Sequence, residues 1–337
     1  MPDKLNGLPN RKLYPSYLNA WRNARLEEVI DKTFKLLESC SICPRRCKVN
    51  RLKNEAGFCK TGLDPRVYSY FSHHGEEPPI SGLKGSGTIF FSGCNMACVY
   101  CQNYLFSQTT EGKSVTCEEL ALFMLELQNL GCHNINLVTP THIMPQILKA
   151  LSLSIAKGLN IPLVYNTSGY ELAEMIELLE GIVDIYLVDI RYADSEISLK
   201  YSSAKDYPRQ NQKAVKEMHR QTGIAKFDQN GIIKSGVIIR QLVLPEDACG
   251  TEKIARFIRD EISNQTYVSL MSQYLPAYKA NNFRELSRRI SPDEYKQALR
   301  TIQEHGLSNG WTQESGGLEK LAGIHIKPMP NPPRRSA

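Results

Sequence analysis

Apolar runs typical of buried strands alternate with amphipathic segments through most of this 337-residue chain. Each run is followed by a stretch whose apolar residues have helical spacing. This alternation predicts a parallel sheet whose strands are joined by right-handed helical crossovers. We expect strands at residues 88–91, 135–138, 162–165, 183–188, 236–245 and 267–273, and helices at 116–130, 144–157, 171–179, 251–262 and 292–304.

Six strand-helix units, rather than eight, predict an α/β fold that is a partial (β/α)6 barrel. In such sheets the ligand binds at the carboxyl ends of the strands. Polar motifs follow the expected strands at that edge: a three-cysteine loop, the turn 139–142, the turn 166–170, Asp189 and Arg191. The sequence therefore predicts a functional site along this edge.

Three cysteines, Cys94, Cys98 and Cys101, follow the first expected strand at C-x3-C-x2-C spacing. A closed structural metal site uses four protein ligands, whereas three thiolates on a 4Fe-4S cluster leave one iron open to a small molecule. An electron carrier would be expected to supply a fourth thiolate near Cys101, and the sequence has none there. The alternatives are a fragment of a zinc knuckle or three unrelated buried cysteines.

A second group, Cys40, Cys43, Cys47 and Cys59, has C-x2-C-x3-C spacing with a fourth thiol a short loop away. Four thiols are a complete ligand set, so this group predicts a closed site that holds a second Fe-S cluster or a structural zinc. Spacing does not distinguish the two metals. The alternative is a loop-rich segment that binds no metal.

The other three cysteines, Cys117, Cys132 and Cys249, stand alone and are expected to be plain buried thiols. Seven of ten cysteines in two tight groups indicate metal binding under reducing conditions rather than disulfides. The N-terminus lacks the pattern of a secretion signal, and no apolar run approaches the about 18 residues of a membrane span. We therefore expect a cytoplasmic location, and the net charge of +6, without a run of like charges, gives no reason to expect a nucleic-acid partner.

The expected organisation has four parts. Residues 1–39 are a helical lead-in with a helix over 17–39, residues 40–87 a cysteine-rich metal-binding module, residues 88–306 the catalytic core, and residues 307–337 a partly disordered C-terminal extension. The glycine-containing segment 71–87 is either a place where backbone approaches a ligand or a solvent loop, and its His73 and His74 are given no role. Trp311 is expected to pack on the barrel from the C-terminal extension.

The cysteine loop, with Tyr100 just before its last cysteine, resembles the radical S-adenosylmethionine (radical SAM) superfamily. Further short sequence motifs resemble those of the pyruvate formate-lyase activating enzyme-like proteins often labelled PflX. They are CxxCPRRC at 40–47, HGEEPPISG at 74–82, SGCNMxCxYCQN at 92–103, HNINLVTPTH at 133–142, YNTSGY at 165–170 and QY at 273–274. The resemblance runs from about residue 40 to residue 306.

This resemblance implies that the three-cysteine loop holds a 4Fe-4S cluster whose open iron binds SAM, and that reduction of SAM yields a 5′-deoxyadenosyl radical. It places Tyr100 against the adenine, and Asn166, Ser168 and Asp189 beside the amino acid part of SAM or a cation near it. The activating enzymes have Gly-Gly-Glu and Asp-x-Lys where this chain has residues 139–142 and Asp189-Ile-Arg191. The further candidates for SAM contact are Thr139, His142, Arg191 and Arg240, of which Arg240 faces either the barrel interior or a helix.

Two classes of function stay open at this point. The first is a radical SAM enzyme that abstracts hydrogen from a protein glycine, as a glycyl-radical-enzyme activase does, or from a small molecule or RNA. The second is a non-catalytic Fe-S or zinc protein that carries electrons or scaffolds a partner. An enzyme would need a reductant such as flavodoxin or ferredoxin. The lateral gap of a six-unit barrel favours a macromolecular substrate, and Gln273 and Tyr274 could line the substrate side.

Overall fold

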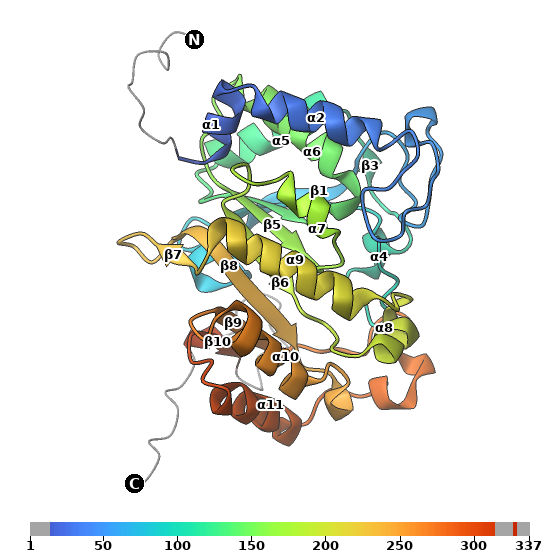
Figure 1. Ribbon diagram of the computed structural model, residues 1–337, viewed down its shortest axis with the longest axis vertical. Coiled ribbons are helices and arrows are strands. Elements are labelled where there is room, and N and C mark those ends of the chain that lie inside the picture. Colours follow the sequence, from blue (N-terminus) through green and yellow to red (C-terminus); the bar gives the residue numbers. More distant parts are fainter. Residues whose placement is uncertain (1–13, 314–325, 329–337) are drawn as a thin grey trace.

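The computed structural model describes residues 14–313 and 326–328 (Figure 1). The expected disorder after Lys327 concerns residues that lie, apart from Pro328, outside the described range. The strands are β1 Arg66–His73, β2 Ser86–Phe91, β3 Lys113–Ser114, β4 Ile135–Val138, β5 Leu163–Thr167, β6 Ile185–Asp189, β7 Lys226–Phe227, β8 Ile233–Leu242, β9 Tyr267–Met271, β10 Gly310–Gln313 and β11 Ile326–Pro328. The helices are α1 Tyr17–Arg22, α2 Arg25–Lys35, α3 Pro78–Ser81, α4 Tyr104–Ser107, α5 Cys117–Asn129, α6 Met144–Ile155, α7 Ala173–Glu177, α8 Ser195–Ser202, α9 Tyr207–Thr222, α10 Thr251–Phe257 and α11 Pro292–Glu304.

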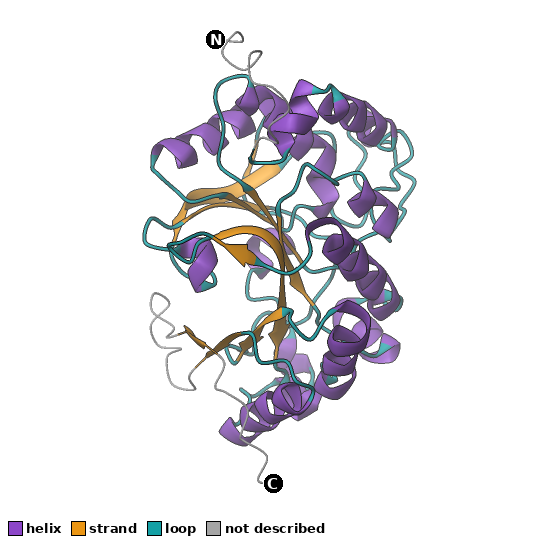
Figure 2. Ribbon diagram, turned by 60° about the vertical axis from the view of Figure 1, so that its left-hand side comes forward, coloured by secondary structure: helices purple, strands orange, loops and turns teal. Residues whose placement is uncertain are grey.

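One largely parallel sheet organises the chain, with strand order β11-β10-β9-β8-β6-β5-β4-β2-β1-β3 and β7 paired to β8. All pairs from β2 to β10 along this order are parallel. Figure 2 shows most of the helices packed against one face of the curved sheet, whereas the short helix α3 packs on the other face. The expected α/β fold, a parallel sheet with helical crossovers, is confirmed.

Five strands of the described sheet were not expected: β1, β3, β7, β10 and β11. Segment 66–73, inside the predicted cysteine-rich module, forms β1 and pairs antiparallel with β2. Trp311 is not a tail residue packed on the barrel but part of β10, which adds to β9 in parallel and places the indole 5.5 Å from the ring of Tyr267. Short strands at the edges of a sheet have weak sequence patterns, because only a few residues alternate.

The alternation of side chains along the strands separates two apolar regions. Outward-facing residues such as Tyr186 and Val188 belong to the large core between sheet and helices. Inward-facing residues at the amino-terminal half of the strands form a smaller apolar cluster: Ile80 of α3, Val164, Ile185, Leu187 and Ile238, with Ala225 and Ile233. Two residues further along β5, β6 and β8, the side chains on the same inner face are polar: Asn166, Asp189 and Arg240. The barrel interior is therefore apolar at one end and polar at the end where ligands bind.

Two helices begin where the sequence predicts. Thr116 and Glu119 form the predicted capping box at the start of α5, and α11 spans the predicted residues 292–304. The predicted single helix over 17–39 is wrong, because Ala24 adopts a left-handed conformation (φ 59°) that separates α1 from α2. Of the helices in residues 14–313, none has both the length and the apolar character needed to cross a membrane.

Candidate active site at the carboxyl ends of the strands

The three-cysteine loop begins where β2 ends, at the polar end of the barrel. Gly93 makes the turn with φ +84°, and a Cβ at this position would stand 2.4 Å from the carbonyl oxygen of Cys59. Only glycine tolerates both the backbone conformation and this approach. Cys98 is buried, whereas Cys94 and Cys101 are partly exposed.

Each of the three sulfur atoms has a hydrogen-bonding neighbour. These are the Met96 N–H for Cys94 (3.3 Å), Arg191 Nη1 (3.3 Å) and Ser202 Oγ (3.0 Å) for Cys98, and Ser107 Oγ for Cys101 (3.1 Å). Burial raises the pKa of the Cys94 thiol to about 12, and the Met96 amide and the Arg191 guanidinium act against this rise. A thiol that lies among hydrogen-bond donors and a cation suits a metal-bound thiolate, because the metal replaces the proton.

The donor set fits an iron-sulfur cluster better than a single ion. Within the described residues, no three His, Cys, Asp or Glu side chains surround a point that one metal ion could occupy, and this holds for the four N-terminal cysteines as well as for the three of the loop. A cluster with several irons separates its thiolates more widely than one ion does. Three observations therefore suit the loop to an iron-sulfur cluster. Its three thiols share one loop, hydrogen-bond donors surround them, and Arg191 lies beside Cys98.

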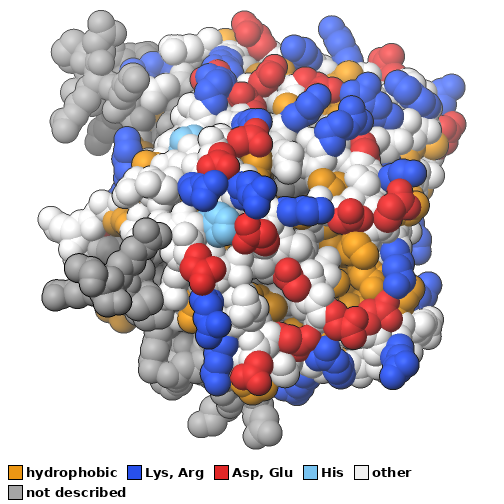
Figure 3. All heavy atoms as spheres, turned by 60° about the horizontal axis from the view of Figure 1, so that its bottom comes forward, with side chains coloured by type: hydrophobic (Ala, Val, Ile, Leu, Met, Phe, Trp, Pro, Cys, Tyr) orange, Lys and Arg blue, Asp and Glu red, His pale blue; other side chains and the backbone are white. Residues whose placement is uncertain are grey.

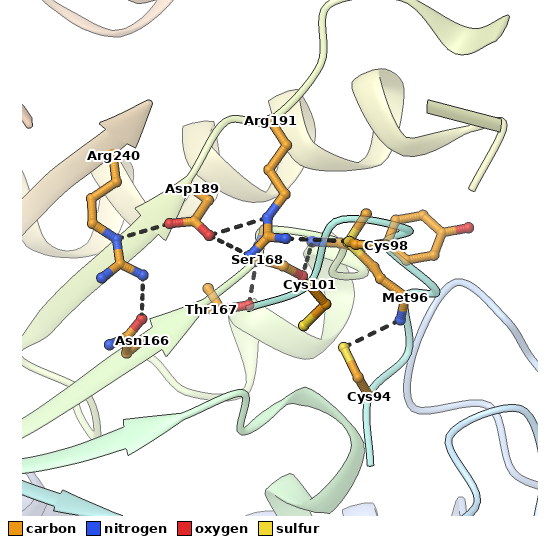
Figure 4. Close-up of polar contacts among 12 residues, drawn as sticks. Cys94, Met96, Cys98, Cys101, Asn166, Thr167, Ser168, Asp189, Arg191 and Arg240 are labelled. Atoms are coloured by element: carbon orange, nitrogen blue, oxygen red, sulfur yellow. Dashed lines mark hydrogen bonds and ion pairs between the residues drawn. The ribbon is translucent and has the colours of Figure 1, made fainter. Parts of the chain in front are cut away.

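Asp189, the last residue of β6, lies between two arginines (Figure 4). Its Oδ2 accepts from Arg191 Nη2 at 2.7 Å and Nε at 3.1 Å, and its Oδ1 accepts from Arg240 Nε at 2.8 Å. Burial alone would raise the pKa of Asp189, but Arg240 and Arg191 outweigh it and hold that pKa below its ordinary value. Because Arg191 also donates to Cys98 Sγ, one continuous chain of contacts joins the cysteine loop to the barrel interior.

Arg240 faces the barrel interior, which settles the alternative left open by the sequence. Its Nη2 donates to Asn166 Oδ1 at 2.7 Å, and its Nη1 lies 3.3 Å from Glu76 Oε2. Glu76 Oε1 accepts from Asn136 Nδ2 at 3.0 Å. The polar layer therefore combines carboxylates, amides and guanidinium groups, which are the groups that recognise a zwitterionic amino acid.

Glu76 and the adjacent Glu77 were missed by the sequence reasoning. In segment 71–87, Glu77 is buried and the side chain of Glu76 is 10% exposed. Burial raises the pKa of each, with Arg240 acting in the opposite direction. The segment is thus not a solvent loop at this point but enters the barrel. The sequence feature that could have indicated them is a pair of acidic residues directly before two prolines, within the motif at 74–82 on which the family resemblance partly rests.

A cavity of about 190 Å³ connects the cysteine loop with this polar layer. Its lining comes from the loop, from β6, β8 and β9 and from their carboxyl ends: Tyr100, Cys101, Gln102, Asn103, Asp189, Arg191, Arg240, Leu242, Met271 and Gln273. Predicted site residues distant in sequence are therefore brought together, namely Tyr100, Asp189, Arg191 and Arg240, along with Gln273.

Other predicted residues lie at the same end of the barrel but outside this lining. Ser168 is buried, and its carbonyl accepts from the Tyr207 hydroxyl. Thr139 begins the turn after β4 with φ +61°, and its N–H donates to the Asn166 carbonyl. Tyr274 is fully buried and donates to the Leu286 carbonyl, so it does not line the substrate side.

His142 does not point into the cavity. Its ring is fully buried behind the cysteine loop, where Nε2 lies 2.8 Å from the Ser92 carbonyl, while Nδ1 has no hydrogen-bond partner among the described residues. Burial lowers the pKa of His142 to about 4, so the ring is neutral and Nε2 is the protonated donor. In this arrangement His142 supports the loop through the Ser92 carbonyl.

The N-terminal cysteines lie together beside the catalytic loop. Burial raises the pKa of Cys43 to about 12, and Cys59, Cys40 and Cys47 add to this rise because they are close enough to act on it. Arg45, within the same motif, donates from Nε to the Asn95 carbonyl at 2.8 Å. The two cysteine groups, separate in the sequence, are neighbours in the fold.

The chain belongs to the radical SAM superfamily, whose family profile matches residues 88–258. It is 35% identical over 282 residues to a protein of Methanocaldococcus jannaschii, "Uncharacterized protein MJ0674", a match that covers 81% of this chain and 76% of that protein. Among solved structures it is similar to HydG, a maturase of the FeFe-hydrogenase, with a TM-score of 0.45 and 13% sequence identity. The matched region covers 67% of this chain and 51% of HydG, so this chain spans about half the length of HydG. It is also similar to methylornithine synthase, PylB (TM-score 0.44, 14% identity, 94% of this chain and 86% of that chain). The superfamily implies a 4Fe-4S cluster and SAM as cofactors.

Proposed function

We propose that this radical SAM enzyme abstracts a hydrogen atom from a macromolecular substrate, as do the activating enzymes of glycyl-radical enzymes that its motifs resemble. The observation that carries the proposal is the polar layer between the three-cysteine loop and the barrel interior. When bound, the cluster and SAM supply one-electron chemistry: reduction of SAM gives methionine and a 5′-deoxyadenosyl radical that removes hydrogen from a substrate.

Residues of different charge would bind different parts of the cluster and SAM. Cys94, Cys98 and Cys101 would hold the cluster. Arg191 and Arg240 present planar guanidinium groups that suit the SAM carboxylate, and Asp189 keeps both in place. Acceptors for the SAM ammonium are available in the carboxylates and amide oxygens of the same layer, where the activating enzymes use Gly-Gly-Glu.

The size of the cavity favours a substrate that is presented from outside. At about 190 Å³ it is smaller than the roughly 300–1,000 Å³ of common small-molecule sites. It does not enclose a metabolite of that size in this conformation, and the larger cavity of about 1210 Å³, lined among others by Glu76, Tyr267 and Trp311, has no residue of the three-cysteine loop in its lining. A loop of a larger partner, with its reacting group inserted through the opening, needs less enclosed volume.

The face of the molecule drawn in Figure 3 gives no support to a nucleic-acid substrate. On the face drawn in Figure 3, lysine and arginine side chains are interspersed with acidic ones. Strong sequence-independent binding to nucleic acid depends on clustered positive charge. A protein substrate, such as a glycine-containing loop, is therefore the substrate class we propose.

The first test is reductive cleavage of SAM by anaerobically reconstituted protein. Wild type should release 5′-deoxyadenosine and methionine, and Cys98→Ala should fall to background. Cys117→Ala is the matched control, because Cys117 is a free thiol that lies outside both cysteine groups. Full cleavage by Cys98→Ala, or none by wild type, would exclude the proposed use of this loop; the latter result would point to an electron-carrying or scaffold role.

The substrate class needs its own test. With a candidate partner deuterated at glycine, label should pass into 5′-deoxyadenosine. If the label instead comes from deuterated metabolites small enough to pass a fine ultrafiltration membrane, the macromolecular substrate is refuted.

The electron that SAM cleavage requires must come from a low-potential one-electron donor, and we propose reduced flavodoxin or ferredoxin as this partner. Each should replace a chemical reductant in the cleavage assay. Failure of both would show that the physiological donor belongs to another class.

The four N-terminal cysteines are proposed as a second metal centre. Their support is the number of thiols and their mutual proximity. In metal analysis, Cys47→Ala should lose either zinc, with iron unchanged, or the iron of one cluster.

A further inference from the structure

Arg51 is a fully buried arginine that forms no ion pair with any acidic residue of the described part of the chain. It is 0% exposed, in the short turn after the N-terminal cysteine motif. Its Nε donates to the Gly62 carbonyl at 2.9 Å and its Nη1 to the His142 carbonyl at 2.6 Å. In the described part of the chain its Nη2 has no hydrogen-bond partner. Both acceptors are neutral, so the two hydrogen bonds leave the positive charge uncompensated, and a buried uncompensated charge is costly.

The four-cysteine group supplies the missing negative charge once it holds a metal. Four thiolates carry more negative charge than a zinc ion or an oxidised 4Fe-4S core adds in positive charge, so either centre is anionic. Arg51 Nε donates to the carbonyl of Gly62, three residues after Cys59, and the N–H of Phe58, the residue before Cys59, donates to Cys47 Sγ, so the buried guanidinium and the thiols are brought together by one short segment. Thiolate centres are commonly tuned by such neighbouring groups, which do not themselves bind the metal.

The same module contacts the catalytic loop at three successive places. Arg51 holds the carbonyl of His142, and the ring of His142 donates to the Ser92 carbonyl. The Cys59 carbonyl lies against Gly93, with no room for a side chain there.

The third contact is made by Arg45, which donates to the Asn95 carbonyl and to the carbonyls of Ser202 and Ser203 at the end of α8. Ser202 in turn donates to Cys98 Sγ. The N-terminal module therefore touches the loop immediately before and after Cys94 and, through Ser202, reaches the second catalytic thiol.

We infer that the N-terminal cysteines hold an anionic metal-thiolate centre whose counter-ion is Arg51, and that this centre fixes the backbone of residues 92–95 and so positions Cys94. Arg51 is a positioning residue here, since it contacts neither SAM nor the catalytic sulfurs. The inference rests on the second metal centre proposed above and adds a role to it. It predicts that loss of the N-terminal metal loosens the catalytic loop even when no catalytic cluster can form.

The first experiment isolates the N-terminal centre in a Cys94→Ala/Cys98→Ala/Cys101→Ala chain. This chain should still bind one centre, measured as zinc or as iron with sulfide, and the two analyses decide the metal. Arg51→Gln keeps a hydrogen-bond donor but removes the charge, and should weaken metal binding about 10- to 100-fold, as loss of a neighbouring group commonly does. Arg51→Lys should restore most of the affinity, and Arg22→Gln on the exposed surface of α1 should have no effect.

The second experiment measures hydrogen exchange of the peptide containing residues 92–95 in the same triple variant. Exchange should be slower with metal than without it, and Cys47→Ala, at a partly exposed thiol, should match the metal-free rate. If the triple variant binds no zinc or iron, the second centre itself is refuted. Equal affinity of Arg51→Gln and its parent, or equal exchange with and without metal, refutes the coupling alone. Cleavage of SAM by wild type is measured independently of all three outcomes.

Discussion

Replacing Asp189 by Asn should destabilise the chain, although the two side chains have almost the same shape. Asp189 is 7% exposed and accepts three hydrogen bonds from two guanidinium groups. An amide offers one oxygen, so its NH2 group must face N–H donors of one arginine. Removing one partner of a buried ion pair costs about 3–5 kcal/mol.

The structure sets the expected value near the lower end of that range. Arg240 keeps Asn166 and Glu76 as partners, and the Arg191 side chain is 27% exposed, so water can replace part of the lost interaction. We therefore expect a loss of about 3 kcal/mol in the free energy of unfolding. The assay is urea unfolding at pH 7 of protein purified without iron, so that metal loss does not contribute.

Asp184, just before β6, is a matched control because it is buried without a cationic partner. It accepts hydrogen bonds from Ser16, and burial raises its pKa to about 6. Its charged form is thus already disfavoured at pH 7, so Asp184→Asn should cost little or should stabilise. A double variant, Asp189→Asn/Arg191→Met, should recover about 0.5–3 kcal/mol by removing an unpaired cation. If Asp189→Asn unfolds like wild type, or costs no more than Asp184→Asn, the electrostatic account of the site is refuted.

Two further predictions concern residues next to the site. Burial raises the pKa of Glu171 from 4.5 to about 7, so the folded chain binds a proton more tightly than the unfolded chain, and stability should fall as pH rises from about 4.5 to 7. Glu171→Gln should remove that fall and gain up to about 3 kcal/mol above pH 7; parallel stability profiles for the two proteins would contradict this. Gly93→Ala should cost more than the roughly 1–2 kcal/mol of backbone strain, because of the Cys59 carbonyl 2.4 Å away, whereas Gly306→Ala, with φ +74° and open space, should show the strain alone. If Gly93→Ala and Gly306→Ala lowered the melting temperature equally, the contact between residue 93 and the Cys59 carbonyl would not be tight.

The sequence by itself determined the class of fold and the position of the cysteine loop. Strand-helix alternation, the capping box at Thr116 and the bounds of α11 depend on residues close together in the chain, and each was predicted correctly. The spacing of Cys94, Cys98 and Cys101 was equally local, and the superfamily to which it pointed is confirmed. Such features are set by near neighbours and need no knowledge of the packing.

Only the tertiary structure decided which polar side chains share the barrel interior. Arg240 could face either side of its strand from the sequence alone, and the register that places it beside Asp189 joins residues far apart in the chain. Glu76 belongs to this layer because its segment enters the barrel, and that path depends on contacts between segments far apart in the chain. The burial of Arg51 beside Cys59 likewise depends on chain segments that meet only after folding. Charge pairing acts through space and does not follow sequence distance, so the cysteine spacing was predictable and the ions around it were not.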